Sequence, residues 1–346
     1  MRQQTEPSTY KDDITSRPIT AVLMFIIGLP ILGFIFLLSI SVGAADVELG
    51  TVWNALFHYD ASINDHVVIR ELRLPRAIAD VIVGACFAVA GAIMQGMTRN
   101  PLAESGILGI NAGSIFMVAI CFAFLPGLSY NLLIVFSFLG AAISMGLIFG
   151  IASLSRIGLT PLRMVLAGAA INALFTALSE GIAIHFDLSQ DIAFWYAGGL
   201  SGVRWEQLLP ALPWMGGALL FAVTLSRSVT ILSLGDDIAS GLGQRVGLIK
   251  LLCTLAVLFL AGIAVSIAGP IGFVGLVIPH VVRFFVGVDY RAIIPCSIVT
   301  GGIFMSLADI GARIINPPYE TPLGSLFALI GVPFFLYIAR RERREL

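Results

Sequence analysis

Residues 105–155 read "SGILGINAGSIFMVAICFAFLPGLSYNLLIVFSFLGAAISMGLIFGIASLS", and this stretch contains no Asp, Glu, Lys or Arg. A helix that crosses a lipid bilayer needs about 20 predominantly apolar residues. The stretch is long enough for two such helices, and Leu125-Pro126-Gly127 offers a turn between them. It therefore predicts a pair of membrane-spanning helices.

The rest of the chain has the same character. Of its 346 residues, 58% are hydrophobic and 12% are charged, whereas soluble domains carry about 25% charged residues. A transmembrane β-barrel would instead show segments of about ten residues with alternating hydrophobicity. The fold class is therefore predicted to be all-α, a polytopic membrane protein. Further stretches without charged residues are 18–45, 207–226, 251–282, 292–308 and 321–339.

Breaks at Gly, Pro and charged residues divide the apolar sequence into ten expected spans. An even number of spans places both termini on one side of the membrane. With the N-terminus inside, 15 of the 20 Lys and Arg residues fall in inner segments, as the positive-inside rule favours. The remaining cations lie in outer segments and are Arg70, Arg73, Arg76, Arg204 and Arg313. The expected spans cover roughly residues 18–42, 75–97, 107–125, 130–153, 161–184, 209–226, 248–268, 271–287, 292–315 and 322–340.

Three of the outer arginines belong to the heptapeptide "RELRLPR" at residues 70–76. Arg76 is followed by Asp80 in the next span, and Asp309 is followed by Arg313, both at i, i+4 spacing. Residues at this spacing lie on one helix face, so an ion pair within the helix is the simplest expectation for each. Ionisable side chains inside a membrane are also candidates for function, and both interpretations remain open here.

Small residues recur every four positions in two expected spans. This spacing lets helix backbones approach closely in lipid, so both series are predicted to be packing faces. The first series is Gly84, Ala88, Ala92 and Gly96, and the second is Ala169, Ala173, Ala177 and Gly181.

Residues 269–279 read "GPIGFVGLVIP" and combine three glycines with two prolines. Backbone groups that such residues free inside a membrane must be buried in protein or face water. The stretch therefore predicts a short, broken helix inside the bundle, close to any pathway, with a loop between two ordinary spans as the alternative. We assign Gly272, Gly275 and Pro279 to this break.

The longest inner loop, residues 227–250, carries a second helix signal. Ser233-Leu234-Gly235-Asp236 fits a capping-box start, and Asp236 and Asp237 would then lie in a first turn, where the helix dipole favours acidic residues. Apolar residues follow at helical spacing. We predict a short amphipathic helix over about residues 233–245 on the cytoplasmic face, either docked to another protein or lying on its own bundle.

Signatures of catalysis are absent from the sequence. Its lysines are Lys11 and Lys250, and neither completes a Walker A motif. The four cysteines fall in apolar runs and are expected to be buried hydrophobic residues. Histidines and cysteines show no metal-ligand spacing. We therefore expect no ATPase site, no catalytic residue, no metal site and no cofactor.

Ordered blocks of the sequence resemble the FecCD-type permeases, the membrane subunits of ABC importers for ferric siderophores, haem and cobalamin. The resemblance begins with Arg73-Leu-Pro-Arg76 and is strongest at residues 272–280, "GFVGLVIPH". It covers nearly the whole chain after residue 45. Other matching blocks are "TRNPLAE" at 98–104, "GGLSG" at 198–202, "LGDD" at 234–237, "PLG" at 322–324 and "GVPF" at 331–334.

The resemblance implies a type II ABC importer permease fold with ten transmembrane helices in each of two subunits, identical or paralogous, around a central pathway. It also implies two cytoplasmic ATP-binding subunits, an extracytoplasmic substrate-binding protein and no nucleic acid. On this basis residues 18–340 are expected to form a single permease domain in the bacterial cell membrane. Residues 1–17 and 341–346 are expected to be cytoplasmic tails.

Individual residues acquire roles only through this resemblance. Docking of the binding protein is implied for the outer arginines Arg73, Arg76 and Arg313. An inner gate is implied at Leu159, Thr160 and Pro161, where Pro161 departs from the small polar pair expected. Coupling to the ATPases is implied for Leu234, Gly235, Asp236, Asp237, Ile238, Ala239 and Leu242.

The expected cargo is a ferric siderophore, with haem and cobalamin as alternatives in the same family. An ion-coupled secondary transporter is an alternative from another class, and it would need ion sites near the bilayer midplane. The chain has few carboxylates in its spans and no evident inverted repeat. A membrane-embedded enzyme would need clustered catalytic residues, and none appears. The sequence therefore favours an importer subunit that is driven by separate ATPases.

Overall fold

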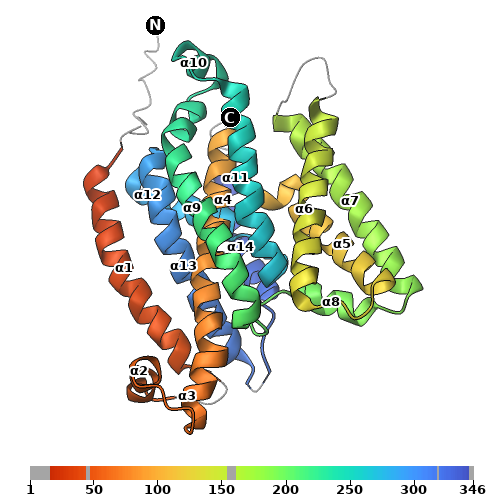
Figure 1. The fold of residues 1–346 in the computed structure, drawn as a ribbon. Coiled ribbons are helices and arrows are strands. Elements are labelled where there is room, and N and C mark those ends of the chain that lie inside the picture. The colour runs from red at the N-terminus through yellow and green to blue at the C-terminus, as the bar shows by residue number, and fades with distance from the viewer. Residues whose placement is uncertain (1–15, 44–46, 154–160, 318, 343–346) are drawn as a thin grey trace, which may run out of the picture.

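The computed structural model describes residues 16–43, 47–153, 161–317 and 319–342, and every regular element in these ranges is helical. The long helices stand side by side as a bundle (Figure 1). Seven helical segments are long and apolar enough to cross a membrane. They are α1 (Pro18–Ser41), the continuous segment Asn64–Thr98, α6 (Tyr130–Ser153), α7 (Pro161–His185), α9 (Trp205–Ser233), α11 (Val246–Ala268) and α13 (Tyr290–Ile315).

Three shorter apolar helices stand where the sequence predicts three more spans. They are α5 (Ile110–Phe124), α12 (Val274–Val286) and α14 (Leu323–Glu342). The predicted all-α class is confirmed. Within the described residues, length and apolarity alone identify seven crossings, so the predicted count of ten is not confirmed.

Several short helices lie outside the predicted spans. They are α2 (Leu49–Phe57), α3 (Asn64–Val68) and α8 (Ser189–Ala197), and the 3₁₀ turn η2 (Ser105–Leu108) overlaps the start of the span expected at 107–125. The heptapeptide at 70–76, expected to precede a span, lies inside a helix, because α3, the π-helical turn η1 (Ile69–Arg73) and α4 (Leu74–Thr98) follow one another without interruption. A π-helical turn of this kind is often found at a functional site.

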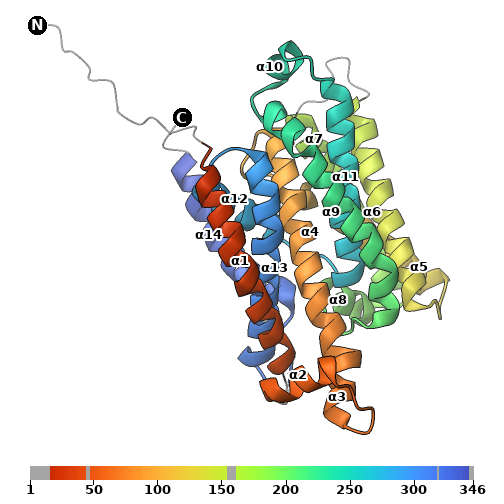
Figure 2. The ribbon, with the colours of Figure 1, turned by 60° about the vertical axis from the view of Figure 1, so that its left-hand side comes forward.

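Helix α4 is the centre of the bundle. Within its most apolar window 83% of the residues are buried, against 6% for α1, which runs along the outside (Figure 2). α4 packs against α9, α11, α12 and α13. A Cβ on Gly84 would lie 2.3 Å from the carbonyl oxygen of Gly301. The small residues of α4 therefore form a packing face, as predicted.

The second series of small residues behaves differently. Ala169, Ala173 and Ala177 of α7 are exposed, and a Cβ on Gly181 would meet no atom within 4 Å. α7 turns another face to its neighbours, where Phe175 stacks on Phe116 of α5 with ring centroids 4.7 Å apart. The predicted packing face on α7 is therefore wrong for contacts within this chain.

The helical path is interrupted between α11 and α12, as predicted at Gly272, but α12 runs without a break through Gly275 and Pro279, so the predicted break at these two residues is wrong. α11 ends at Ala268, and Gly269 and Phe273 take positive φ values of 73° and 69° before α12 begins at Val274. Gly275 then packs against the backbone of α4. A Cβ on Gly91 would lie 1.8 Å from the carbonyl oxygen of Gly275, so no side chain fits at this crossing.

The bundle has two distinct ends (Figures 1 and 2). Helix α1 begins and α14 ends at the end that carries α10 (Asp236–Gly241), which we call the α10 end. The opposite end carries α2 and α3, and we call it the α2 end.

Candidate functional site

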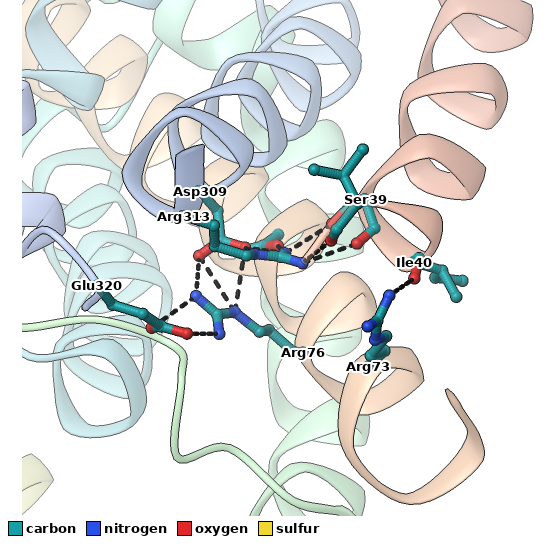
Figure 3. Close-up of polar contacts among 9 residues, drawn as sticks. Ser39, Ile40, Arg73, Arg76, Asp309, Arg313 and Glu320 are labelled. Carbon is teal, nitrogen blue, oxygen red and sulfur yellow. Dashed lines mark hydrogen bonds and ion pairs between the residues drawn. The ribbon is translucent and has the colours of Figure 1, made fainter. Parts of the chain in front are cut away.

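Five ionisable side chains gather at the α2 end and form what we call the arginine cluster (Figure 3). Asp80 and Asp309 are fully buried, and the side chains of Arg313 and Arg76 are 6% and 11% exposed. Glu320, in the connection between α13 and α14, is the outermost member at 43%. The members of the arginine cluster come from α4, α13 and the connection between α13 and α14, so the cluster joins elements that are distant in sequence.

Arg76 lies between two carboxylates. Its Nε donates to both carboxylate oxygens of Asp309 at 3.2 and 3.1 Å, and its Nη2 donates to Asp309 Oδ1 at 2.7 Å. On its outer side, Nη1 and Nη2 donate to the two carboxylate oxygens of Glu320 at 2.7 and 3.0 Å. Arg76 therefore makes one bidentate pair towards the core and another towards the surface.

Arg313 and Arg73 hold the end of α1. The last carbonyl groups of a helix have no partner within the helix. Arg313 Nη1 donates to the carbonyl oxygens of Ser39 and Val42 at 2.8 and 2.9 Å. Arg73 Nη1 donates to those of Ile40 and Ser41, both at 2.8 Å. These two arginines therefore supply the hydrogen bonds that the end of α1 lacks.

One of the two predicted ion pairs is confirmed. Arg313 pairs with Asp309, and its Nε donates to Asp309 Oδ2 at 2.9 Å. The predicted pair between Arg76 and Asp80 is wrong, because Arg76 turns to Asp309 and Glu320 instead. The carboxylate oxygens of Asp80 are buried without a hydrogen-bond partner, and Arg313 Nη2 lies 3.8 Å away. Contacts between helices have overridden the spacing within one helix.

Sequence reasoning missed two members of this site. Ser39 accepts from Arg313 through its side chain at 2.9 Å, and Glu320 pairs with Arg76. Neither residue lies in a motif, and Glu320 is 244 positions from Arg76. The packing of α1 and α4 beside α13 brings these residues together.

Two other outer arginines remain exposed at the same end. The guanidinium of Arg70 lies 4.5 Å from the ring centroid of Tyr59, and Arg204 precedes α9. Trp205 Nε1 donates to the carbonyl oxygen of Arg70 at 2.7 Å, which brings the start of α9 to the π-helical turn. Both cations are therefore accessible on this face.

The predicted amphipathic helix exists at the α10 end, in a shorter form. α10 covers Asp236–Gly241, and its N-cap is Gly235 with a φ of 121°. The predicted capping box is wrong, because the Ser233 hydroxyl donates to the carbonyl of Thr230. The backbone that enters α10 turns through the glycine instead, a conformation that other residues rarely adopt.

The apolar stripe of this segment is exposed. Leu234, Ile238 and Leu242 are 52%, 54% and 64% exposed, whereas Ala239 is buried against the bundle. Asp236 anchors α10, since its carboxylate accepts from Lys250 Nζ at 2.6 Å and lies 3.9 Å from Arg99. Asp237 is exposed.

A cavity of about 760 Å³ opens between α5, α7 and α8. Its polar lining includes Glu104, Asn111, Asn172, Thr176, Ser179 and Glu180. Glu104 precedes η2, and its carboxylate accepts from the backbone N–H of Phe273 at 2.5 Å. Burial raises the pKa of Glu104 to about 7, although that hydrogen bond opposes the rise. Glu104 therefore ties the cavity wall to the start of α12.

The predicted pathway and gate residues are not among the described residues that line this cavity. Gly272, Gly275 and Pro279 are absent from the described lining of the cavity, but a Cβ on Gly272 would lie 3.7 Å from Glu104 Oε1. Pro161 is the first residue of α7. Leu159 and Thr160 fall outside the described residues.

The fold and these sites define a class: a polytopic helical membrane protein with a glycine-rich connection between α11 and α12 and a polar-lined cavity, as in transport subunits. Residues 31–341 match the model of the FecCD transport family. The chain belongs to this family.

Curated relatives agree over most of the chain. It is 55% identical over 332 residues to the iron(3+)-hydroxamate import system permease protein FhuB of Bacillus subtilis (strain 168), covering 96% of this chain and 86% of that one. It is 43% identical to the iron-uptake system permease protein FeuB of the same organism, with 89% and 92% coverage. It is 41% identical to the Fe(3+)-citrate import system permease protein YfmD, also from that organism, with 94% and 97% coverage. These relatives are transport components rather than enzymes.

A solved structure has the same fold. It is described as an inward-facing conformation of a metal-chelate type ABC transporter, and it superposes with a TM-score of 0.80 at 28% identity. The match covers 92% of this chain and 99% of the other. The likeness therefore extends over the whole bundle.

Proposed function

We propose that this chain is the membrane-spanning permease subunit of an ATP-driven importer of ferric siderophores. The observation that carries the proposal is the 55% identity to a ferric hydroxamate permease over 96% of the chain. A ferric hydroxamate is therefore the cargo class that we favour. Haem and cobalamin are weaker candidates, because the relatives compared above are named for iron, hydroxamate or citrate import.

The proposed topology has ten crossings, with both termini in the cytoplasm. Three facts support it: the short apolar helices α5, α12 and α14 occupy the expected positions, α1 begins at the end where α14 finishes (Figure 2), and most cations fall in inner segments. The α10 end is then cytoplasmic and the α2 end is extracytoplasmic. A cysteine placed at Ser62 should react with an impermeant thiol reagent from outside, and one at Asp237 should not.

The cargo path in this proposal follows the cavity between α5, α7 and α8. Its lining mixes amide, hydroxyl and carboxylate groups with apolar residues, which suits a polar chelate that must pass without tight binding. The exposed small-residue face of α7 adjoins this cavity and suits close packing against a second permease subunit. The path would then lie between two subunits, identical or paralogous.

Coupling in this proposal uses α10. An exposed apolar stripe at the cytoplasmic end of a membrane protein suits insertion into a cleft of an ATP-binding subunit. Each Å² of apolar surface that is buried in the contact contributes about 25 cal/mol of favourable free energy. Two ATPase subunits would bind one permease each. Their closure on ATP would shift α10 and, through α9 and α11, the bundle.

Docking of the extracytoplasmic binding protein is assigned to the α2 end. Of the three arginines expected there, Arg76 is the best placed, since it reaches the surface through Glu320 (Figure 3). Arg73 and Arg313 hold the end of α1 and would support the docking surface. The exposed Arg70 and Arg204 would add positive charge that steers an acidic partner.

The test is uptake of radioactive iron in cells that lack their own ferric hydroxamate permease. This chain would be supplied together with its ATP-binding and binding-protein subunits. We expect iron from a neutral ferric trihydroxamate to accumulate only when all components are present. Haem or cobalamin uptake without ferric hydroxamate uptake would refute the assigned cargo.

A further inference from the structure

The outer side of Arg76 is already occupied in the isolated chain. Glu320 takes the Nη1 and Nη2 edge in a bidentate pair, at 2.7 and 3.0 Å. The edge formed by Nε and Nη2 is held by Asp309, which is fully buried. A guanidinium has five N–H donors in a fixed plane, and four of them thereby point to a carboxylate. A further carboxylate can therefore make a bidentate pair with Arg76 only in the place of Glu320.

Glu320 is the member of the cluster that is free to leave. Its side chain is 43% exposed, whereas those of Asp309 and Asp80 are fully buried. It lies outside the helices, between α13 and α14, and Tyr319 beside it is 72% exposed. If another carboxylate takes the place of Glu320 on Arg76, water can solvate the Glu320 carboxylate. A displaced Asp309 would instead lose its partners inside the protein.

The charge of Glu320 points the same way. Its carboxylate places a negative charge on the exposed edge of Arg76, and this charge opposes the approach of an acidic surface. Movement of Glu320 away from Arg76 removes that charge at the contact and leaves the outer edge of Arg76 open to a new carboxylate.

We propose that Glu320 is an internal competitor that occupies the docking edge of Arg76 until a carboxylate of the binding protein replaces it. The proposal rests on the docking role assigned above to Arg76, and it adds a regulation of that contact. One carboxylate replaces another, so the net gain per contact is small. Docking is thereby kept reversible, as repeated delivery of cargo requires.

The experiment measures capture of the cargo-loaded binding protein by the permease, assembled with its ATPases in lipid nanodiscs. Glu320→Gln removes the competing charge, and Glu320→Ala also removes the acceptor. Exposed ion pairs are weak, so we expect the dissociation constant to fall about two- to fivefold in both variants. Glu71→Gln is the matched control, because it removes an exposed acid from the same end without touching the cluster, and it should leave the constant unchanged.

A double-mutant cycle assigns the effect to Arg76. In the Arg76→Lys background, which keeps the charge and loses the bidentate geometry, Glu320→Gln should no longer improve capture. Unchanged or weaker capture by both Glu320 variants would overturn the proposal, as would an equal gain from Glu71→Gln. Such results would leave docking itself intact. By contrast, a wild-type complex that captures no binding protein would refute the proposed function.

Discussion

At the scale of single residues, the outer arginines show how one residue type serves two purposes. The sequence presents Arg73, Arg76 and Arg313 as alike, yet each has different surroundings. Arg313 is nearly buried and holds both Asp309 and the end of α1. Arg76 pairs with Glu320 near the surface. A structural role and the proposed docking role therefore fall in one cluster.

Substitution of Arg313 should destabilise the fold more than it changes docking. Arg313→Ala leaves two carbonyl groups of α1 without their donor and removes one partner of buried Asp309. Breaking a buried ion pair costs about 3–5 kcal/mol, and we expect a loss of that size in thermal unfolding of the purified protein. Arg204→Ala, at an exposed position, should change little. A stable Arg313→Ala protein that fails only to capture the binding protein would contradict this assignment.

Glu104 gives a prediction on pH. The folded chain raises its pKa from 4.5 to about 7, so the folded state holds the proton more tightly than the unfolded state. Its contribution to stability is therefore complete below about pH 4.5, declines as the pH rises towards 7 and is constant above that. Glu104→Gln should flatten this part of the pH profile, measured as unfolding midpoints between about pH 5 and 8. Identical profiles for the two proteins would refute the burial of this carboxyl.

At the scale of elements, apolar content predicts where a helix lies in lipid but not where it ends. The span expected at 209–226 is the middle of α9, which runs from Trp205 to Ser233. Arg204 and Gln207 exchange hydrogen bonds that cap the start of α9 ahead of the apolar part. At the other end, the helix extends past Arg227, beyond the apolar part. Helix ends depend on such caps and on water outside the membrane, and hydropathy records neither.

The same limit applies to the sites. The interruption at 269–273 was predictable because glycine and proline act locally, but Gly275 and Pro279 were wrongly assigned to it, since α12 continues through both. The series on α7 was misjudged because small residues mark a packing face without naming the partner. Arg76 pairs with Asp309 and Glu320 rather than with Asp80. Both partners lie more than 200 positions from Arg76 in the sequence, so no local pattern could reveal these pairs.

Helix α10 should be required for ATPase binding and dispensable for folding. Ile238→Glu places a charge on the exposed stripe, and apolar anchors of this kind typically contribute about 2 kcal/mol or more to an interface. We expect roughly 30-fold weaker binding of the ATP-binding subunit, measured with purified components, and an unchanged unfolding midpoint. Leu49→Glu, at an equally exposed position of α2, is the control. Undiminished ATPase binding by Ile238→Glu would exclude α10 as the contact.

Gly235 is a poor choice for this test, since its φ of 121° makes any substitution strained.

At the scale of the whole molecule, the two ends of the bundle differ in chemistry. One end offers an apolar stripe on α10, and the other offers arginines and an exposed acid. Between them lie a tightly packed core around α4 and a polar cavity beside the exposed face of α7. This division suits a conduit that is moved by proteins bound at its two ends, rather than by ions bound at its centre.

The most direct measurement is transport in sealed liposomes that contain the permease assembled with its ATPases. The binding protein and a radioactive ferric trihydroxamate would be added outside, and ATP would be enclosed. The account predicts that iron accumulates without any ion gradient, and that a non-hydrolysable ATP analogue or omission of the binding protein stops it. Accumulation by the permease alone, driven by an imposed proton or sodium gradient, would contradict the account.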